Sequence, residues 1–335
     1  MCNVVTFGEI MLRLCPKGYR RILQADEFEA TYAGAEANVA AALSRWRLGT
    51  QFVSKVPENP LGQAAVDALR KCGIGTENVL RGGERLGIYF AERGLGLRSG
   101  QVIYDRAHSA LAQAKKEEFD WKHILKGAQW LHLTGITPAL GGQTAAICEE
   151  ACMEAKRQNI RVSIDVNFRK KLWTQQQAGK TLSRLLPMAE AVFVGSAEMQ
   201  SLFGISCSES ASREDSFFEG ARQICRMFGI ETVATTLREG KEAQRNTLKG
   251  LLFQEGQNFQ SRTYDVAIAD RLGGGDAFAA GLIYALLQKM SSECAIEFAT
   301  AASCLKHTCE GDFNQMSVQE VAALAQGGDG GCVLR

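Results

Sequence analysis

The most chemically suggestive stretch of the sequence is D-R-L-G-G-G-D-A-F-A-A-G, at residues 270–281. Three consecutive glycines precede Asp276, and small and apolar residues that favour a helix follow it. Glycines before a helix let main-chain N–H groups converge at its positive end, where an anion can bind. An aspartate there could be a simple helix cap, but a cap needs no glycines. The pattern favours Asp276 as a catalytic base beside an anion hole made by the amides of Gly273, Gly274 and Gly275.

No other phosphate-binding loop in the sequence fits a known pattern. Gly179-Lys180-Thr181 ends like a G-x-x-x-x-G-K-[ST] motif, but Thr174 stands where its first glycine should be. The stretch G-L-G-L-R-S (94–99) is an interrupted G-x-G-x-x-G. It does not follow the first predicted strand, and this context excludes a dinucleotide-binding interpretation.

The composition indicates an ordinary globular protein. The chain has 335 residues, a net charge of +1, and hydrophobic and charged fractions of 46% and 22%. Near-neutral charge argues against a nucleic-acid-binding or polybasic membrane surface. No apolar run approaches the roughly 20 residues that span a bilayer, and the N-terminus lacks the pattern of a signal peptide. The 11 cysteines show no C-x-x-C pair, so we expect reduced cysteines in a cytoplasmic protein.

Strand-like and helix-like patterns alternate along most of the chain, which predicts an α/β fold with a mainly parallel central sheet flanked by helices. Strands are predicted over 3–10, 51–56, 130–136, 161–167, 191–196 and 231–237, and helices over 36–46, 60–73, 143–159, 175–189, 198–203 and 213–228. No repeat or linker divides the chain, so a single domain over 1–335 is expected.

Two segments, 11–33 and 86–106, break this alternation. The second of them looks like two strands joined by a glycine-rich turn. Short strands inserted into an α/β body could form a small β-sheet that serves as a lid over a ligand cleft. A surface hairpin without a function is an equally good interpretation of these residues alone.

The glycine-rich stretch resembles the C-terminal signature of the ribokinase-like, or PfkB, carbohydrate kinases, usually G-A-G-D-x-F. A-G-A-E-A-N-V-A-A-A-L-S-R-W-R-L-G (33–49) resembles the first motif of the same family. The resemblance covers almost the whole chain. It implies a ribokinase-like fold, a lid at 11–33 and 86–106, and phosphorylation of a sugar with ATP and Mg²⁺. Lid strands in this family often pair between subunits, which implies a homo-oligomer.

Within that family the sequence is most similar to 2-keto-3-deoxygluconate kinases. The stretches that carry this similarity are Y-F-A-E-R-G (89–94), V-I-Y-D-R-A-H-S-A (102–110), I-D-V-N-F-R-K-K-L-W (164–173) and G-D-F-N (311–314). The resemblance implies a substrate-binding set of Gly34, Asn38, Tyr89, Tyr104, Arg106, Arg169 and Asp276. Gly34 and Asn38 would hold sugar hydroxyls, and the two tyrosines would reach down from the lid.

Arg106 and Arg169 would meet the carboxylate of an acidic sugar. Two arginines can clamp a planar carboxylate with paired hydrogen bonds, whereas a neutral hexose gives such a pair no partner. Simpler roles are also compatible with the sequence. Arg106 could be a solvated charge at a strand end, and Arg169 could pair with Asp165. The tyrosines could be packing residues.

The resemblance also implies a nucleotide-binding set of Ser196, Thr235, Arg238, Gly240, Gly273, Gly275 and Asn314, with residues 237–242 as a loop beside ATP. Glu198 occupies the glutamate of an N-x-x-E motif and would organise Mg²⁺ through water. Gly195 replaces the asparagine of that motif, Ala33 replaces the first glycine of a usual Gly-Gly pair, and Arg271-Leu272 replaces the common Thr-Thr. Magnesium keeps several waters, so one missing amide need not abolish binding.

The sequence therefore predicts an ATP-dependent kinase that phosphorylates 2-keto-3-deoxygluconate, with Asp276 as the general base. One alternative is a kinase of the same family that acts on fructose, ribose or a nucleoside. Another is a catalytically silent sugar-binding protein on the same fold. The four histidines show no metal-site or triad spacing, and His132 is expected to be a core residue. The exact sugar, the oligomeric state and any monovalent-cation requirement stay open.

Overall fold

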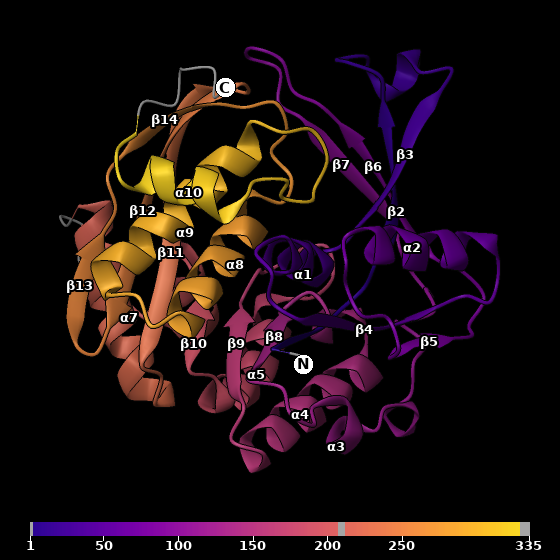
Figure 1. Ribbon diagram of the computed structural model, residues 1–335, viewed down its shortest axis with the longest axis horizontal. Helices are drawn as coiled ribbons and strands as arrows, with labels where there is room; N and C mark the ends of the chain where they lie inside the picture. The colour runs from indigo at the N-terminus through magenta and orange to yellow at the C-terminus, as the bar shows by residue number, and fades with distance from the viewer. Residues whose placement is uncertain (1–2, 207–211, 329–335) are drawn as a thin grey trace.

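The computed structural model describes residues 3–206 and 212–328, and a large twisted sheet runs through their centre (Figure 1). Its strands are β1 (Val4–Phe7), β4 (Thr50–Val56), β5 (Val79–Arg81), β8 (Trp130–Thr134), β9 (Arg161–Asp165), β10 (Ala191–Phe193), β11 (Thr232–Glu242), β12 (Arg245–Gln254), β13 (Gln257–Gln260) and β14 (Tyr264–Ala267). The order is β13-β12-β11-β10-β9-β8-β1-β4-β5, and β14 pairs with β12. The strands from β11 to β5 are parallel to their neighbours, whereas β12, β13 and β14 add antiparallel pairs.

Helices cover both faces of this sheet, as the alternation of patterns predicted. They are α1 (Ala35–Arg45), α2 (Pro60–Lys71), α3 (Trp121–Ile124), α4 (Gly142–Arg157), α5 (Gln175–Leu185), α6 (Ser196–Phe203), α7 (Arg213–Phe228), α8 (Gly274–Leu287), α9 (Ser292–His307) and α10 (Val318–Ala325). Short 3₁₀ helices lie at η1 (Ile22–Gln24), η2 (Lys116–Glu118), η3 (Pro138–Leu140) and η4 (Leu186–Met188). None of the helices in the described ranges is long and apolar enough to cross a membrane.

The central strands are buried on both sides, so successive residues enter different apolar clusters. Val5 and Leu131 face the helices α4 to α7, whereas Val4 and Trp130 face α1, α8 and α9. This two-sided burial explains why the strands are near-continuous apolar runs. Because all the parallel strands end at the same edge, the loops that follow them are brought together there.

A second, four-stranded sheet projects from the body beside α1 and α2 (Figure 1). It consists of β2 (Met11–Pro16), β3 (Phe28–Ala33), β6 (Gly87–Glu92) and β7 (Gln101–Asp105), in the order β3-β2-β6-β7. All four strands lie within the two segments that broke the α/β alternation. The predicted fold class, a mainly parallel sheet with flanking helices and a separate small sheet, is confirmed.

Residues 237–242 differ from the sequence expectation. They were expected to form a loop, but they are the distal part of β11 and pair with β12 from Leu237↔Lys249 to Glu242↔Arg245, with an irregularity between Glu239 and Glu242. The segment is polar and shows no strand-like alternation on its own. Its extended form depends on pairing with β12, which is a non-local contact that local sequence patterns do not report.

Candidate active site

A cleft of about 420 Å³ lies at the carboxyl edge of the large sheet, between the start of α8 and the small sheet. It brings together most of the residues that the sequence singled out. These are Gly34, Asn38, Tyr89, Tyr104, Arg106, Arg169, Glu198, Arg238, Gly273, Gly274, Gly275 and Asp276. Every member of the predicted substrate-binding set and of the predicted anion hole therefore lines one cavity.

The glycine run begins helix α8, and close packing explains two of its three glycines. Gly273 has φ = 81°, and a Cβ on it would lie 2.1 Å from the carbonyl oxygen of Asp312. A Cβ on Gly274 would lie 2.1 Å from the imidazole of His307. A Cβ on Gly275 would meet no atom within 4 Å, so this residue opens toward the cleft. The first-turn amides of α8 have no acceptor within the helix and are available to an anion.

Asp276 lies in the first turn of α8 and is half-buried in the cleft. Its Oδ2 accepts a hydrogen bond of 2.6 Å from Nδ2 of Asn38, whose own Oδ1 accepts from the amide of Gly34 at 3.4 Å. Burial raises the pKa of Asp276 to about 7; the Asn38 hydrogen bond opposes this shift and the charge of Asp312 adds to it. A carboxyl group with this pKa can accept and release a proton near neutral pH.

Two further carboxyl groups, Asp165 and Glu198, face the same cleft. Asp165 ends β9, and burial raises its pKa to about 8, with the charges of Glu198 and Asp276 adding to the shift. Its Oδ1 accepts a 3.0 Å hydrogen bond from the amide of Asn167, a non-glycine residue with φ = 37°. From the sequence, Asp165 was considered only as a partner of Arg169. Its position at the end of a buried strand was the signal that could have identified it.

The chemistry of these oxygen donors fits a magnesium ion that keeps most of its waters. Glu198 uses Oε2 to accept a 2.9 Å hydrogen bond from the amide of Gly195 at the start of α6. A Cβ on residue 195 would lie 3.3 Å from that oxygen, so glycine lets the carboxylate fold back on the amide. No three His, Cys, Asp or Glu side chains of the described ranges are arranged to bind one metal directly. Magnesium bound through water needs no such group.

Both arginines that are predicted to bind the sugar carboxylate line the cleft, but they differ in burial and in ion pairing. Arg106 is buried, and its Nε donates a 2.7 Å hydrogen bond to Oε2 of Glu9, which also forms an ion pair with Nη2. The interpretation of Arg106 as a solvated charge is therefore wrong. Arg169 is exposed at the cleft, and within the described part of the chain it forms no ion pair within 4 Å, with Asp165 or any other carboxylate.

Two more arginines lie beside the glycine run. Arg238 of β11 is near His307, with 3.4 Å between Nη2 and Nε2, and burial together with the charge of Arg271 lowers its pKa. Arg271 donates hydrogen bonds of 3.0 Å to the carbonyls of Glu242 and Ala243. In the sequence Arg271 stands out only as a departure from a motif, but in the structure it adds a second cation to this end of the cleft.

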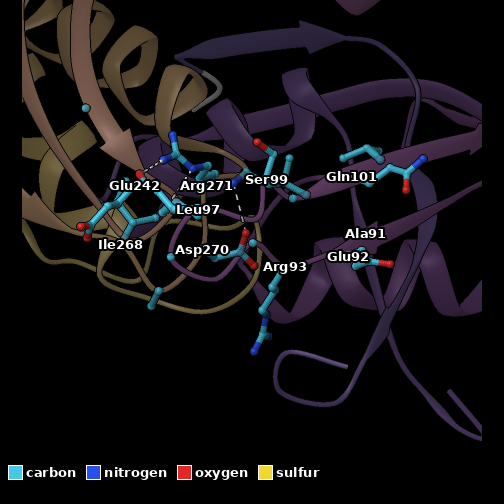
Figure 2. Close-up of a pocket in the computed structure, with 18 of the residues that line it drawn as sticks. Ala91, Glu92, Arg93, Leu97, Ser99, Gln101, Glu242, Ile268, Asp270 and Arg271 are labelled. Carbon is cyan, nitrogen blue, oxygen red and sulfur yellow. Dashed lines mark hydrogen bonds between the residues drawn. The ribbon is translucent and has the colours of Figure 1, made fainter. Parts of the chain in front are cut away.

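The predicted nucleotide-binding set is not held in one cavity. Gly240 lines a second cavity of about 410 Å³, between the turn after β6 and the end of β11 (Figure 2). Thr235 lies close to Gly195, with 3.8 Å between its Oγ1 and a Cβ built on the glycine, and Ser196 is the next residue. Asn314 is buried outside the cleft lining and accepts a 3.0 Å hydrogen bond from the amide of Met316.

Comparisons with known proteins agree with this geometry. A model of the pfkB family of carbohydrate kinases matches residues 1–318. A 2-dehydro-3-deoxygalactonokinase of Haloferax volcanii is 30% identical over 331 residues, which cover 98% of each chain. A 2-dehydro-3-deoxygluconokinase of Bacillus subtilis is 28% identical and covers 96% of this chain and 94% of that protein. The crystal structure of a 2-dehydro-3-deoxygluconokinase from Thermotoga maritima is 45% identical, with a TM-score of 0.95, and covers 98% of this chain and 100% of that one. The predicted ribokinase-like fold is confirmed.

The raised pKa of Asp276 predicts that this residue lowers stability at high pH. An aspartate in the unfolded chain ionises near pH 3.9, whereas folded Asp276 keeps its proton up to about pH 7. The folded state therefore binds more protons than the unfolded state between about pH 4 and 7, and its stability falls as the pH rises through that range. Asp276→Asn keeps an acceptor for Asn38 and removes the charge, so it should raise the free energy of unfolding by ~1 kcal/mol or more above about pH 8, and change it little near pH 4.

Urea denaturation at the two pH values measures this difference. Asp26→Asn, which removes an exposed carboxylate between η1 and β3, controls for the general effect of removing a negative charge. A variant at residue 276 that is no more stable than the parent protein at high pH would contradict the proposed electrostatic state.

Proposed function

The chain belongs to the pfkB family of carbohydrate kinases, and from that premise we propose that it phosphorylates 2-keto-3-deoxygluconate on its primary hydroxyl with ATP as the phosphate donor. The carrying observation is the juxtaposition, in one cleft, of the Asp276 carboxyl group, the amides of the glycine run and the guanidinium of Arg169, which pairs with no carboxylate of the described residues. The first two suit phosphoryl transfer to a hydroxyl, and the third suits an acidic sugar.

In this mechanism Asp276 accepts the proton of the attacking hydroxyl. Its pKa near 7 lets the carboxylate form exist at neutral pH while leaving it basic enough to take a proton. Asn38 fixes the carboxylate through its 2.6 Å hydrogen bond, so the free oxygen of Asp276 faces the substrate. The amides at the start of α8 and the cations of Arg238 and Arg271 stabilise negative charge on the transferring phosphoryl group.

Magnesium, held through water by Glu198 with Asp165 nearby, would neutralise charge on the phosphates of ATP when bound. We assign the nucleotide itself to the end of the cleft near Arg238, with Ser196, Thr235 and Gly240 at its borders and Asn314 behind. The small sheet lies over the sugar side and acts as a lid that excludes water from the reacting groups.

The acidic sugar is proposed to bind Arg169 directly, with Arg106 held in place by Glu9 beside it. The contacts with Glu9 use Nε and Nη2 of Arg106, so its Nη1 can donate hydrogen bonds to the sugar while Arg169 supplies the charge. The Haloferax volcanii relative favours a second candidate, the substrate that differs in configuration at one carbon, 2-keto-3-deoxygalactonate. A coupled ADP-release assay across sugar acids and neutral sugars separates these candidates.

Replacement of the base tests the catalytic assignment. Asp276→Asn should lower kcat by about 10²–10⁴-fold, because the proton of the attacking hydroxyl loses its acceptor. Binding of 2-keto-3-deoxygluconate, measured by calorimetry, should change little because the amide keeps a polar contact with Asn38. Near-normal turnover in this variant would rule out Asp276 as the base.

Replacement of Arg169 tests the substrate class. Arg169→Ala should raise KM for the acidic sugar roughly 10- to 100-fold, because a charge-assisted hydrogen-bond pair is lost. Turnover of a neutral sugar such as fructose, where measurable, should be almost unchanged. The neighbouring exposed cation gives the control Lys171→Ala. Equal losses for acidic and neutral sugars would favour a neutral substrate.

We also propose that the protein forms a homo-oligomer through the small sheet. Large apolar side chains are exposed on this sheet and its turns; among them are Leu23 and Leu97, with exposed fractions of 90% and 89%, and Ile103 and Tyr104 on the edge strand β7. Unpaired edges and exposed apolar side chains are typical of interfaces. Unpaired cysteines throughout the described residues suit a reducing compartment, which supports the cytoplasm.

Light scattering after size-exclusion chromatography should therefore give a mass at least twice that of one chain. Substituting Ile103→Lys on the edge strand should shift the protein toward the monomer, because a desolvated charge opposes edge pairing. Met153→Lys, an exposed apolar residue on α4, is the matched control. A monomeric parent protein would contradict the proposal.

A further inference from the structure

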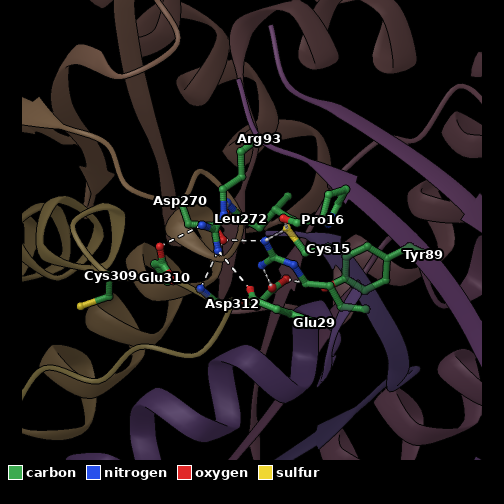
Figure 3. Close-up of polar contacts among 12 residues, drawn as sticks. Cys15, Pro16, Glu29, Tyr89, Arg93, Asp270, Leu272, Cys309, Glu310 and Asp312 are labelled. Carbon is green, nitrogen blue, oxygen red and sulfur yellow. Dashed lines mark hydrogen bonds and ion pairs between the residues drawn. The ribbon is translucent and has the colours of Figure 1, made fainter. Parts of the chain in front are cut away.

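Arg13 connects the small sheet to the loops that shape the anion hole. It lies on β2, and its side chain is only 3% exposed. One terminal nitrogen lies 2.6 Å from Oδ2 of Asp270, and the other forms an ion pair with Oδ1 of Asp312. Both carboxylates, labelled in Figure 3, belong to the body of the protein, so a cation of the small sheet is held between two anions of the body.

The two carboxylates also fix the backbone on either side of the glycine run. Asp270 accepts hydrogen bonds from the amide of Leu272 at 3.1 Å and from the amide of Gly311 at 3.2 Å, so it ties one loop to the other. The carbonyl of Asp312 packs against Gly273, the residue at which α8 is capped. Movement of either carboxylate would therefore move the amides that face the cleft.

A second contact from the small sheet ends on the same carboxylate. Tyr89 of β6 donates a 2.7 Å hydrogen bond to Oδ2 of Asp312, and its ring also lines the sugar side of the cleft. Burial disfavours the charged form of Arg13, but the charges of Asp312 and Asp270 outweigh this effect and raise its pKa. Lys306, also buried, lies close to the same carboxylates, so two cations and two anions are enclosed together.

We propose that Arg13 is a positioning residue that couples the placement of the small sheet to the geometry of the anion hole. This inference rests on the proposed function, because it assigns the amides at the start of α8 a role in phosphoryl transfer. When the small sheet is seated on the cleft, Arg13 holds Asp270 and Asp312, and these hold the backbone of residues 270–275. A seated lid and an ordered anion hole then occur together, which favours transfer to sugar over transfer to water.

Hydrogen exchange of the full-length protein without ligands tests the coupling independently of activity. Arg13→Met keeps much of the side-chain volume and removes the charge. We expect exchange to become about tenfold faster or more in peptides that cover 11–16, 270–276 and 311–312, and to stay unchanged in the central strand β8. Arg245→Met removes an arginine from the exposed ion pair with Asp265 and is the matched control.

Kinetics of the same variants give the second readout. Arg13→Met should lower kcat for sugar phosphorylation about 10- to 100-fold and lower the ratio of sugar phosphorylation to ATP hydrolysis by water, because the amides are displaced. Arg13→Lys keeps the charge but cannot span both carboxylates. Its kcat should therefore lie between those of the parent protein and Arg13→Met. In Arg13→Gly, guanidinium ion at a non-denaturing concentration should restore part of kcat, and it should not do so in Arg245→Gly.

Unchanged exchange at 270–276 would overturn the inference, as would an equal increase over all peptides, which would make Arg13 an ordinary contributor to global stability. Absence of rescue by guanidinium in a folded Arg13→Gly variant would also overturn it. A parent protein that phosphorylates no sugar acid would instead refute the proposed function, and the exchange experiment would still decide whether the two parts are coupled.

Discussion

The structure of the site depends on close packing of the backbone at the start of α8. Gly273 packs against the carbonyl of Asp312, and Gly274 packs against the ring of His307, at distances that exclude any side chain. These contacts fix where α8 begins and which way its first amides point. Asp276 follows in the first turn, so its position relative to those amides is set by the helix itself and needs no further support. Asn38 then selects the orientation of its carboxylate.

Charge in the cleft is distributed so that like charges meet on each side. Burial raises the pKa values of Asp165 and Asp276 to near neutrality. The charges of Glu198 and Asp276 add to the shift of Asp165, and the charge of Asp312 adds to that of Asp276. Arg238 and Arg271 repel each other at the other end. Ligands of opposite charge would relieve both arrangements, a cation for the carboxylates and phosphates for the arginines. The Glu9–Arg106 pair differs, because its two charges neutralise each other within the protein.

The sequence predicts the features of this site that are local in the chain. The glycine run before Asp276, the helix at 36–46 that carries Asn38, and the two strands within 86–106 all follow from patterns within about 20 residues. The structure places Asn38 against Asp276, 238 residues later, and Arg106 against Glu9, 97 residues earlier. The family resemblance implies functional roles for Asp276, Asn38 and Arg106. It could not anticipate the internal partner of Arg106, because an ion pair between two loop residues 97 positions apart leaves no local trace. The extended form of residues 237–242 was missed for the same reason, because it depends on pairing with β12 and not on a local pattern.

Buried polar contacts between the small sheet and the body determine orientation more than they add stability. Removing two carboxylates and a guanidinium from water costs several kcal/mol per ion, and their mutual attraction offsets much of this cost. A well-packed apolar contact could join the two parts at least as tightly, but it would tolerate sliding, since dispersion contacts are not directional. Arg13 can satisfy Asp270 and Asp312 together only in one placement of β2. The geometry of the ion pairs therefore selects a single seating of the small sheet, and the exposed apolar side chains at its far end leave that end available for contacts with another chain.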